Sequence, residues 1–419
     1  MERPGQIKSF LVFLICSVLW SSNYAGTLLV GKSKNYQSIR DALKHALPGD
    51  TLLIYPGVYN EGLIHITQPL ILKGVQFPVL DGVFKNEILS IESNRVVVEG
   101  FIFRNAGKSS YNDMAALRLS DCRYVEIKNN RFENSFFGIY AQHATACTIR
   151  GNYLVSNASD EISSGNGIHN WKCDSMQIIE NTVTGHRDGI YFEFVSNSII
   201  KNNNSFKNVR YGLHFMFSSG NTFLHNTFNS NGAGVAVMYS KDIRMFENDF
   251  QNSKGAAAYG ILMKDITDSD LSKNRFRFNT VAVYMEGSNR ITIHKNDFFR
   301  NGWALKMQAS CMENVITVNH FIGNSFDVST NGDLVLSRFF KNYWDKYQGY
   351  DLNRDGIGDV PYRPVSLYSL IAEKNASSML LYRSFIVTLM DLLEKMIPVF
   401  TPVDLKDDAP MIQPLNATI

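Results

Sequence analysis

The fold is decided by residues 210–250, which read RYGLHFMFSSGNTFLHNTFNSNGAGVAVMYSKDIRMFENDF. Two short patterns occur twice in this stretch. A glycine is followed by an aliphatic residue at Gly212-Leu213 and Gly234-Val235. An apolar residue is followed by Asn three positions later and by a second apolar residue five positions later, at Phe223-Asn226-Phe228 and Met245-Asn248-Phe250. Each pattern returns after 22 residues, which indicates a repeat protein.

Both patterns extend far beyond this stretch. The Asn positions are Asn130, Asn152, Asn181, Asn204, Asn226, Asn248, Asn274, Asn296 and Asn319, where Asn204 lies in a stretched run of Asn. Their intervals are 22, 29, 23, 22, 22, 26, 22 and 23 residues. The small-aliphatic pair continues at Gly138-Ile139, Gly167-Ile168, Gly189-Ile190, Gly260-Ile261, Ala282-Val283 and Ala304-Leu305. The longer intervals predict loops inserted at one corner of a coil.

Two short strands in each repeat cannot bury their apolar faces alone. Stacked coils can, because parallel strands about 4.8 Å apart then enclose one continuous core. Asn suits this arrangement, since it tolerates left-handed corners and its amides can bond from coil to coil. The sequence therefore predicts an all-β, right-handed parallel β-helix with coils of about 22 residues.

The two ends of the chain differ from this repeat. Arg3 and Lys8 precede the apolar run 10–20, which is typical of a signal peptide (residues 1–25) and too short to span a bilayer. An amphipathic helix from Ser38 to Ala46 is expected to cap the first coil. We expect the β-helix to cover residues 26–340, an Asp-rich connection 341–366, and a helical docking extension 367–419.

Composition narrows the function. Forty-one Lys and Arg residues balance 39 Asp and Glu residues, so nothing points to nucleic acid or to a charged membrane surface. Removal of the signal peptide leaves Cys122, Cys147, Cys173 and Cys311. Their spacing does not suggest a disulfide framework, and we expect reduced thiols.

Sulfur on the outer surface suggests a metal site. In the strand that carries the small-aliphatic pair, side chains alternate between the two faces. The second and fourth residues after the small residue therefore face outward. Met216 and Met238 are fourth residues of adjacent coils, and His214 is the second residue of its coil. Two thioethers and an imidazole form a soft site that suits Cu(I). The alternative is that these Met side chains simply pack beneath a loop.

Parallel β-helices also include enzymes that act on polysaccharides, and this alternative stays open. Such enzymes need clustered carboxylates on the outer face of a sheet. Asp188, Glu193 and Glu286 are scattered, but His169, Tyr191 and His214 share one outward column that could be an acid/base row. The alternative function is therefore a polysaccharide lyase, hydrolase or epimerase.

Several stretches resemble the NosD family. They are Asn166-Gly167-Ile168, Arg187-Asp188-Gly189-Ile190, residues 210–219, residues 232–240, residues 258–262, residues 342–344 and residues 351–366. The resemblance implies a periplasmic, non-catalytic copper-handling protein of nitrous-oxide-reductase maturation. It also implies four partners: the membrane subunit and the ATPase subunit of an ABC transporter, a copper-donating lipoprotein chaperone, and nitrous oxide reductase.

A second metal candidate lies in the tail. Asp351, Asn353 and Asp355 stand at positions 1, 3 and 5 of a calcium-type loop, Ile357 at position 7 and Asp359 at position 9. Gly356 at position 6 allows the turn, but position 12 is Tyr362 in place of Glu. The hypothesis is a structural Ca²⁺ or Mg²⁺ ion, and the alternative is an Asp-rich turn.

Apolar residues at helical spacing from Ser377 to Met396 predict one amphipathic helix. Arg383, Asp391, Glu394 and Lys395 interrupt it, so it does not read as a membrane span. It is expected either to cap the solenoid or to dock on a partner, and contact with the membrane is expected only through that partner. The sequence has no nucleotide-binding motif, so ATP hydrolysis would belong to a partner.

Overall fold

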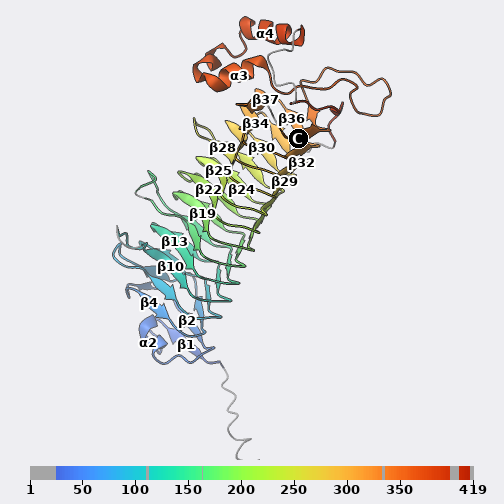
Figure 1. Cartoon of the computed structure of the whole chain (residues 1–419). Coiled ribbons are helices and arrows are strands. Elements are labelled where there is room, and N and C mark those ends of the chain that lie inside the picture. Colours follow the sequence, from blue (N-terminus) through green and yellow to red (C-terminus); the bar gives the residue numbers. More distant parts are fainter. Residues whose placement is uncertain (1–24, 110–112, 163, 333–335, 397–404, 416–419) are drawn as a thin grey trace, which may run out of the picture.

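The chain forms one elongated parallel β-helix (Figure 1). The computed structural model describes residues 25–109, 113–162, 164–332, 336–396 and 405–415. Three parallel sheets run along these residues, and each strand pairs with its equivalent in the coils before and after it. The predicted all-β parallel β-helix is confirmed, with about 14 coils. Residues 1–24 of the predicted signal peptide lie outside the described residues.

Fourteen strands form sheet A in the described chain. They are β1 (Thr27–Val30), β2 (Thr51–Ile54), β5 (Ile71–Gly74), β8 (Val97–Glu99), β11 (Glu126–Lys128), β14 (Thr148–Arg150), β17 (Gln177–Ile179), β20 (Ile199–Lys201), β23 (Thr222–Leu224), β26 (Arg244–Phe246), β29 (Asp270–Ser272), β32 (Thr292–His294), β35 (Val315–Thr317) and β38 (Arg338–Phe340).

Sheet B contains 13 strands within the same described ranges. They are β3 (Val58–Tyr59), β6 (Val79–Asp81), β9 (Ile102–Arg104), β12 (Arg131–Glu133), β15 (Tyr153–Val155), β18 (Thr182–Thr184), β21 (Asn204–Phe206), β24 (Thr227–Asn229), β27 (Asp249–Gln251), β30 (Arg275–Arg277), β33 (Asp297–Phe299), β36 (His320–Ile322) and β39 (Tyr343–Trp344).

Sheet C has 12 strands among the described residues, and several are longer than those of the other sheets. They are β4 (Ile64–Ile66), β7 (Leu89–Ile91), β10 (Ala115–Ser120), β13 (Phe137–Gln142), β16 (Ile168–Trp171), β19 (Asp188–Glu193), β22 (Tyr211–Met216), β25 (Ala233–Met238), β28 (Tyr259–Lys264), β31 (Val281–Glu286), β34 (Trp303–Met307) and β37 (Phe326–Thr330).

The core consists of side chains that stack from coil to coil. In sheet B, successive inward rings lie 4.1 to 5.3 Å apart, in the order Phe228, Phe250, Phe276, Phe298, Phe321 and Trp344. In sheet C, the predicted inward third places are all buried: Phe192, Phe215, Val237, Met263, Met285 and Met307. This burial confirms the predicted alternation of the strand.

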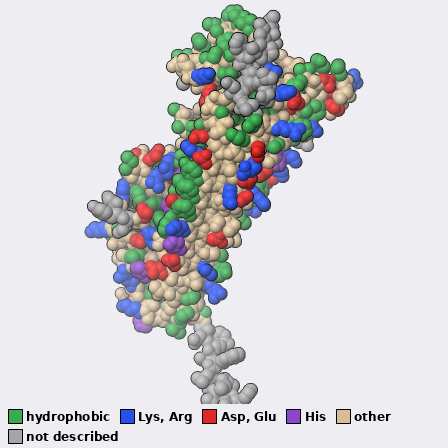
Figure 2. Space-filling view, in the orientation of Figure 1, with side chains coloured by type: hydrophobic (Ala, Val, Ile, Leu, Met, Phe, Trp, Pro, Cys, Tyr) green, Lys and Arg blue, Asp and Glu red, His purple; other side chains and the backbone are tan. Residues whose placement is uncertain are grey.

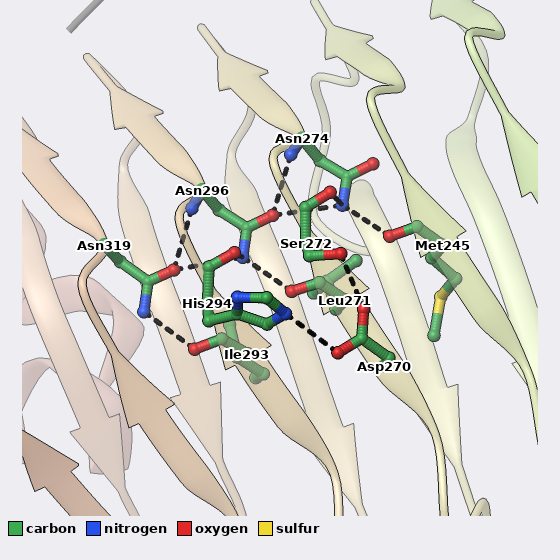
Figure 3. A network of polar contacts seen from close by, with 9 residues as sticks. All are labelled: Met245, Asp270, Leu271, Ser272, Asn274, Ile293, His294, Asn296 and Asn319. Atoms are coloured by element: carbon green, nitrogen blue, oxygen red, sulfur yellow. Dashed lines mark hydrogen bonds and ion pairs between the residues drawn. The ribbon is translucent and has the colours of Figure 1, made fainter. Parts of the chain in front are cut away.

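A ladder of buried Asn residues joins the coils at the corner between sheets A and B (Figure 3). Asn296 Oδ1 accepts hydrogen bonds from Asn274 N at 2.8 Å and from Asn274 Nδ2 at 3.0 Å. Asn274 Nδ2 also donates to Met245 O at 2.8 Å, and Asn296 repeats these bonds with Leu271 and Asn319. Each amide therefore satisfies backbone groups that the corner would otherwise leave unpaired.

Two details of the predicted ladder are wrong. The position assigned to Asn204 belongs to Asn203, whose Oδ1 accepts from Asn181 N, while Asn204 begins β21 and is exposed. The ladder residue is also not the left-handed residue. That role falls to the residue before it, such as Asn202 with φ 57° or Lys295 with φ 56°.

A short helix lies at the first coil. α2 (Ile39–Leu43) is shorter than the predicted 38–46, and Ser38 caps it by accepting from Asp41 N. Ile39 and Ala42 are fully buried, and the helix contacts β1 and β2. The end of the solenoid opposite to α2 carries two further helices (Figure 1).

The predicted single helix 377–396 is wrong, because the helix is interrupted within this range. The described elements are α3 (Leu367–Lys374), the 3₁₀ turn η1 (Ala376–Leu381) and α4 (Phe385–Met396). Arg383 adopts φ 64°, and Ser384 Oγ then accepts from Val387 N, the pattern of a helix N-cap.

Candidate functional site

The two candidate thioethers lie on neighbouring coils. Met216 is the last residue of β22, Met238 is the last residue of β25, and the two are register partners. Both side chains are half-buried. The predicted stacking of Met216 on Met238 on the outer face of sheet C is confirmed by this register.

His214 lies on the same face of β22, but it is far less exposed than the sequence predicts. Its side chain is 5% exposed, because the rings of Tyr191 and Tyr211 lie 4.9 and 4.7 Å from the imidazole. Its Nδ1 is 3.6 Å from Asp188 Oδ2, which is ion-pair distance and beyond a hydrogen bond. Its Nε2 has no hydrogen-bond partner among the described residues.

A buried ion pair supports this imidazole from below. Asp188 is fully buried, and its two oxygens accept from Arg210 Nε at 2.9 Å and Arg210 Nη2 at 2.5 Å. Burial acts to raise the pKa of Asp188. Hydrogen bonds and charge from Arg210, together with His214, outweigh burial and hold that pKa below its usual range.

Tyr191 connects the imidazole to the thioethers. Its ring lies against His214, and its one Oη–H lies within donating distance of both Met216 Sδ, at 3.5 Å, and Glu193 Oε2, at 3.3 Å. Burial, reinforced by the charge of Glu193, raises the pKa of Tyr191. The phenol therefore stays neutral and remains a donor near the Met216 sulfur.

The predicted acid/base column consists of rings that pack against one another, namely His169, Tyr191 and His214. His169 stacks on Tyr140 at 4.4 Å and tilts against Tyr191 at 4.7 Å. Burial, with help from the charge of Arg187, lowers the pKa of His169 to about 3. A neutral, covered imidazole of this kind is a poor acid/base group near neutral pH.

An exposed aromatic ladder, which the sequence analysis did not identify, runs beside the thioethers. Phe194, Phe217 and Tyr239 follow β19, β22 and β25 directly, and their rings stack at 5.2 and 5.0 Å. Each is more than 40% exposed. Hydrophobic side chains gather over these coils in Figure 2. The 23- and 22-residue spacing of the three residues was the available signal.

Comparison with known proteins shows one family to which the chain is similar. Residues 158–355, which contain β22 and β25, match the family described as "Periplasmic copper-binding protein (NosD)". A curated relative from Stutzerimonas stutzeri is named "Probable ABC transporter binding protein NosD". It is 27% identical over 382 residues, covering 85% of this chain and 86% of the relative. The chain is therefore similar to NosD proteins over most of its length.

Another NosD relative, from Pseudomonas aeruginosa, bears the same name and is 27% identical over 371 residues, covering 83% of this chain and 85% of the relative. Among solved structures, the catalytic unit of an α-1,3-glucanase from Streptomyces thermodiastaticus has a TM-score of 0.60, with 12% identity, covering 75% of this chain and 66% of that one. The surface adhesin PfbA of Streptococcus pneumoniae has a TM-score of 0.51, with 10% identity, covering 78% and 93%. These two structures share only the fold.

The Asp-rich loop does not gather its carboxylates into a cage. Asp351 accepts from the backbone N of Asp355 and Gly356, and Asp355 accepts from Ile357 N. Asp359 Oδ2 accepts from Leu352 N at 2.7 Å. In the part of the chain that the structure describes, no three His, Cys, Asp or Glu side chains are placed to hold a metal ion. The arrangement therefore gives no support to a bound Ca²⁺ or Mg²⁺.

The expected reduced cysteines agree with the structure. Cys122, Cys147, Cys173 and Cys311 are all buried and free. Burial raises the pKa of Cys173 to about 12, so this thiol is protonated and unreactive.

The helical extension leaves a large apolar surface uncovered. Tyr368, Ala372 and Val387 pack on β31, β34 and β37 through Val281, Trp303 and Phe326. The opposite side of the extension exposes Leu380, Leu381, Phe385, Ile386, Leu389, Leu392 and Leu393, each by at least 45%. Green side chains are visible at this end of the molecule in Figure 2. In the described chain no helix has the length and apolarity to cross a membrane.

Proposed function

We propose that this chain carries Cu(I) in the periplasm at Met216, Met238 and His214 and passes it on for assembly of nitrous oxide reductase. One observation carries the proposal. Two half-buried thioethers stand in register beside an imidazole whose Nε2 has no partner among the described residues. A buried polar atom without a partner is costly, and such atoms concentrate at functional sites.

The donor set suits copper in its reduced state. Thioether sulfur is a soft ligand and selects Cu(I), whereas harder ions prefer oxygen. Metal-binding histidines commonly direct their second nitrogen at a carboxylate, and Asp188 lies 3.6 Å from Nδ1 of His214. Neither ring nitrogen of His214 has a hydrogen-bond partner among the described residues, and Nε2, the nitrogen not paired with Asp188, is the proposed coordinating atom.

The differing burial of the ligands suits a site that must load and unload. Met216 and Met238 are the more exposed ligands, and His214 lies beneath them at the sheet. A partner can reach the sulfurs directly while the imidazole stays fixed. The aromatic ladder of Phe194, Phe217 and Tyr239 offers an apolar surface beside the sulfurs, where a copper-donating lipoprotein chaperone and the reductase would dock in turn.

The helical extension provides the attachment to an ABC transporter, an association that the names of the relatives support. Its exposed leucines form an apolar patch of the kind that marks protein interfaces. We propose that this patch docks on the membrane subunit. The chain itself has no nucleotide-binding motif, so the ATPase subunit performs the hydrolysis.

We also propose that the chain is not an enzyme. The one outward column that could serve as an acid/base row is a closed ring stack, with the pKa of His169 lowered to about 3. A panel of acidic and neutral polysaccharides should therefore give no turnover. Turnover that disappears in His214→Ala would establish the alternative function.

The copper proposal is tested by competition with a Cu(I) chelator. Met216→Leu/Met238→Leu conserves volume and removes both sulfurs, so we expect Cu(I) affinity to fall by at least about tenfold, or about 1.4 kcal/mol. Met312→Leu is the matched control, because Met312 is 45% exposed and remote from the site in sequence. Unchanged affinity in the double variant, with the fold intact, refutes the proposed ligands.

A further inference from the structure

A hollow lies away from sheet C, at the corner between sheets A and B. It measures about 510 Å³, within the range of small-molecule sites. Acidic, basic and histidine side chains gather on the flank that carries β29 and β32 (Figure 2). The side chains that line the hollow are His225, Glu247, Lys273, Arg275, Lys295, Asp297, Val318, His320 and Leu415.

The carboxylates of this hollow are already engaged. Glu247 lies 3.1 Å from both His225 Nε2 and Lys273 Nζ. Asp297 Oδ1 lies 2.7 Å from His320 Nδ1. Neither acid is therefore available as the main ligand of an incoming cation.

The cations are in excess. Three of them, Lys273, Arg275 and Lys295, line the hollow together with two carboxylates, a balance of +1, and Arg275 also pairs with Asp249 at 3.3 Å. Lys295 is exposed and has no ion-pair partner within the described residues. It stands at a left-handed corner, φ 56°, which directs its side chain away from the core.

His320 provides an independent sign of a missing ligand. Its side chain is 7% exposed, yet Nε2 has no hydrogen-bond partner in the described chain. Asp297 orients the ring by accepting from Nδ1 when that nitrogen carries the proton. An N–H at Nε2 would have no acceptor among the described residues.

We propose that this hollow binds a small multivalent anion, one that carries carboxylate or phosphate groups. Charge-assisted hydrogen bonds would come from Lys273, Arg275 and Lys295. An N–H at His320 Nε2 would donate a further hydrogen bond to a ligand oxygen. The hollow contains no thioether or thiol, so it is distinct in chemistry from the copper site.

Calorimetric titration of the full chain with citrate and with inorganic phosphate, at fixed ionic strength, tests this proposal. We expect citrate to bind and Lys295→Gln to weaken its binding by about tenfold. Lys207→Gln is the matched control, because Lys207 is also exposed and also left-handed, φ 53°, at a position outside the hollow. A second variant, His320→Gln, removes the ring with its Asp297 contact, and thermal unfolding reports whether it folds.

The outcomes separate clearly. Citrate binding without phosphate binding supports a multivalent carboxylate, and binding of both supports a general oxyanion site. Failure of the wild-type chain to bind either anion overturns the proposal. Equal loss in Lys207→Gln and Lys295→Gln also overturns it, since the effect would then be one of net charge.

Discussion

Asp407 Oδ2 accepts a hydrogen bond of 2.9 Å from the backbone N of Asn342. The same oxygen accepts from Asn342 Nδ2 at 3.0 Å and from Trp344 Nε1 at 3.1 Å. Asp407 therefore occupies the place that the next Asn of the ladder would take, although it lies 65 residues later in the chain. Through this contact the tail of the chain closes the open end of the solenoid, as the bridges Phe339–Asp407 and Tyr343–Met411 also indicate.

Asp407→Ala should destabilise the C-terminal coils. Asp407 is fully buried and also accepts from Lys341 N and Ala409 N, so the substitution removes the acceptor of five hydrogen bonds. We expect a loss of about 3 kcal/mol or more, measured by urea unfolding with fluorescence of the buried Trp344.

Asp407→Asn is expected to cost less stability. The amide oxygen of Asn can still accept from Asn342, as an Asn of the ladder does. The amide NH2 group, however, cannot accept from Lys341 N and Ala409 N. The control is Asp408→Asn, whose side chain is 63% exposed. Equal stability of Asp407→Ala and wild type would contradict the closing role.

The repeat was predictable because its physics is local. A glycine or alanine before an aliphatic residue, and an Asn three residues after an apolar one, define strands and corners within one coil. Alternation then assigns faces, so the register of Met216 on Met238 followed from the 22-residue period.

Contacts between residues far apart in the chain could not be predicted from the repeat. Nothing in the tail sequence marks Asp407 as a ladder rung, because its partners are set by where the last coil ends. The burial of His214 likewise depends on Tyr191 and Tyr211 from two different coil positions. Strand alternation places a side chain outside a sheet, but it does not say what covers it.

Buried neutral histidines should make stability depend on pH. His186 is 1% exposed, and neither ring nitrogen has a partner among the described residues. Burial lowers its pKa to about 3, whereas in the unfolded chain it is about 6.5. Its contribution is therefore complete above pH 6.5 and is lost as pH falls toward 3, with a slope of about 1.4 kcal/mol per unit. His169 adds a slope of the same sign.

His186→Phe should flatten this dependence. We expect the wild-type chain to lose more stability between pH 7 and pH 5 than the variant, by about 1 to 2 kcal/mol. Urea unfolding at both pH values measures the difference. Asp188 does not interfere, because its lowered pKa places its titration below this window. His45→Gln, at an exposed site, should keep the wild-type slope.

Arg210→Met should be strongly destabilising, because it leaves the fully buried Asp188 carboxylate without its bidentate partner. Loss of one member of a buried pair typically costs about 3 to 5 kcal/mol. Arg290→Met is the comparison, since Arg290 pairs with Asp268 at the surface and should have little effect. If Arg210→Met/Asp188→Asn restores most of the lost stability, the uncompensated charge was the cause; no recovery points to lost packing instead.

The exposed face of α4 should be needed for partner binding and dispensable for folding. Phe385 is 79% exposed and Leu389 is 45% exposed, so Phe385→Gln/Leu389→Gln removes apolar surface without opening a cavity. We expect an unchanged unfolding midpoint and an at least tenfold weaker association with the transporter in detergent, measured by co-purification and light scattering. Leu47→Gln is the control, because Leu47 is 57% exposed and lies at the far end of the solenoid. Association that survives the double variant would assign docking to another surface.

Cu(I) affinity of the isolated chain should stay the same in the double variant and in its control, because the copper ligands lie on β22 and β25 and not on α4.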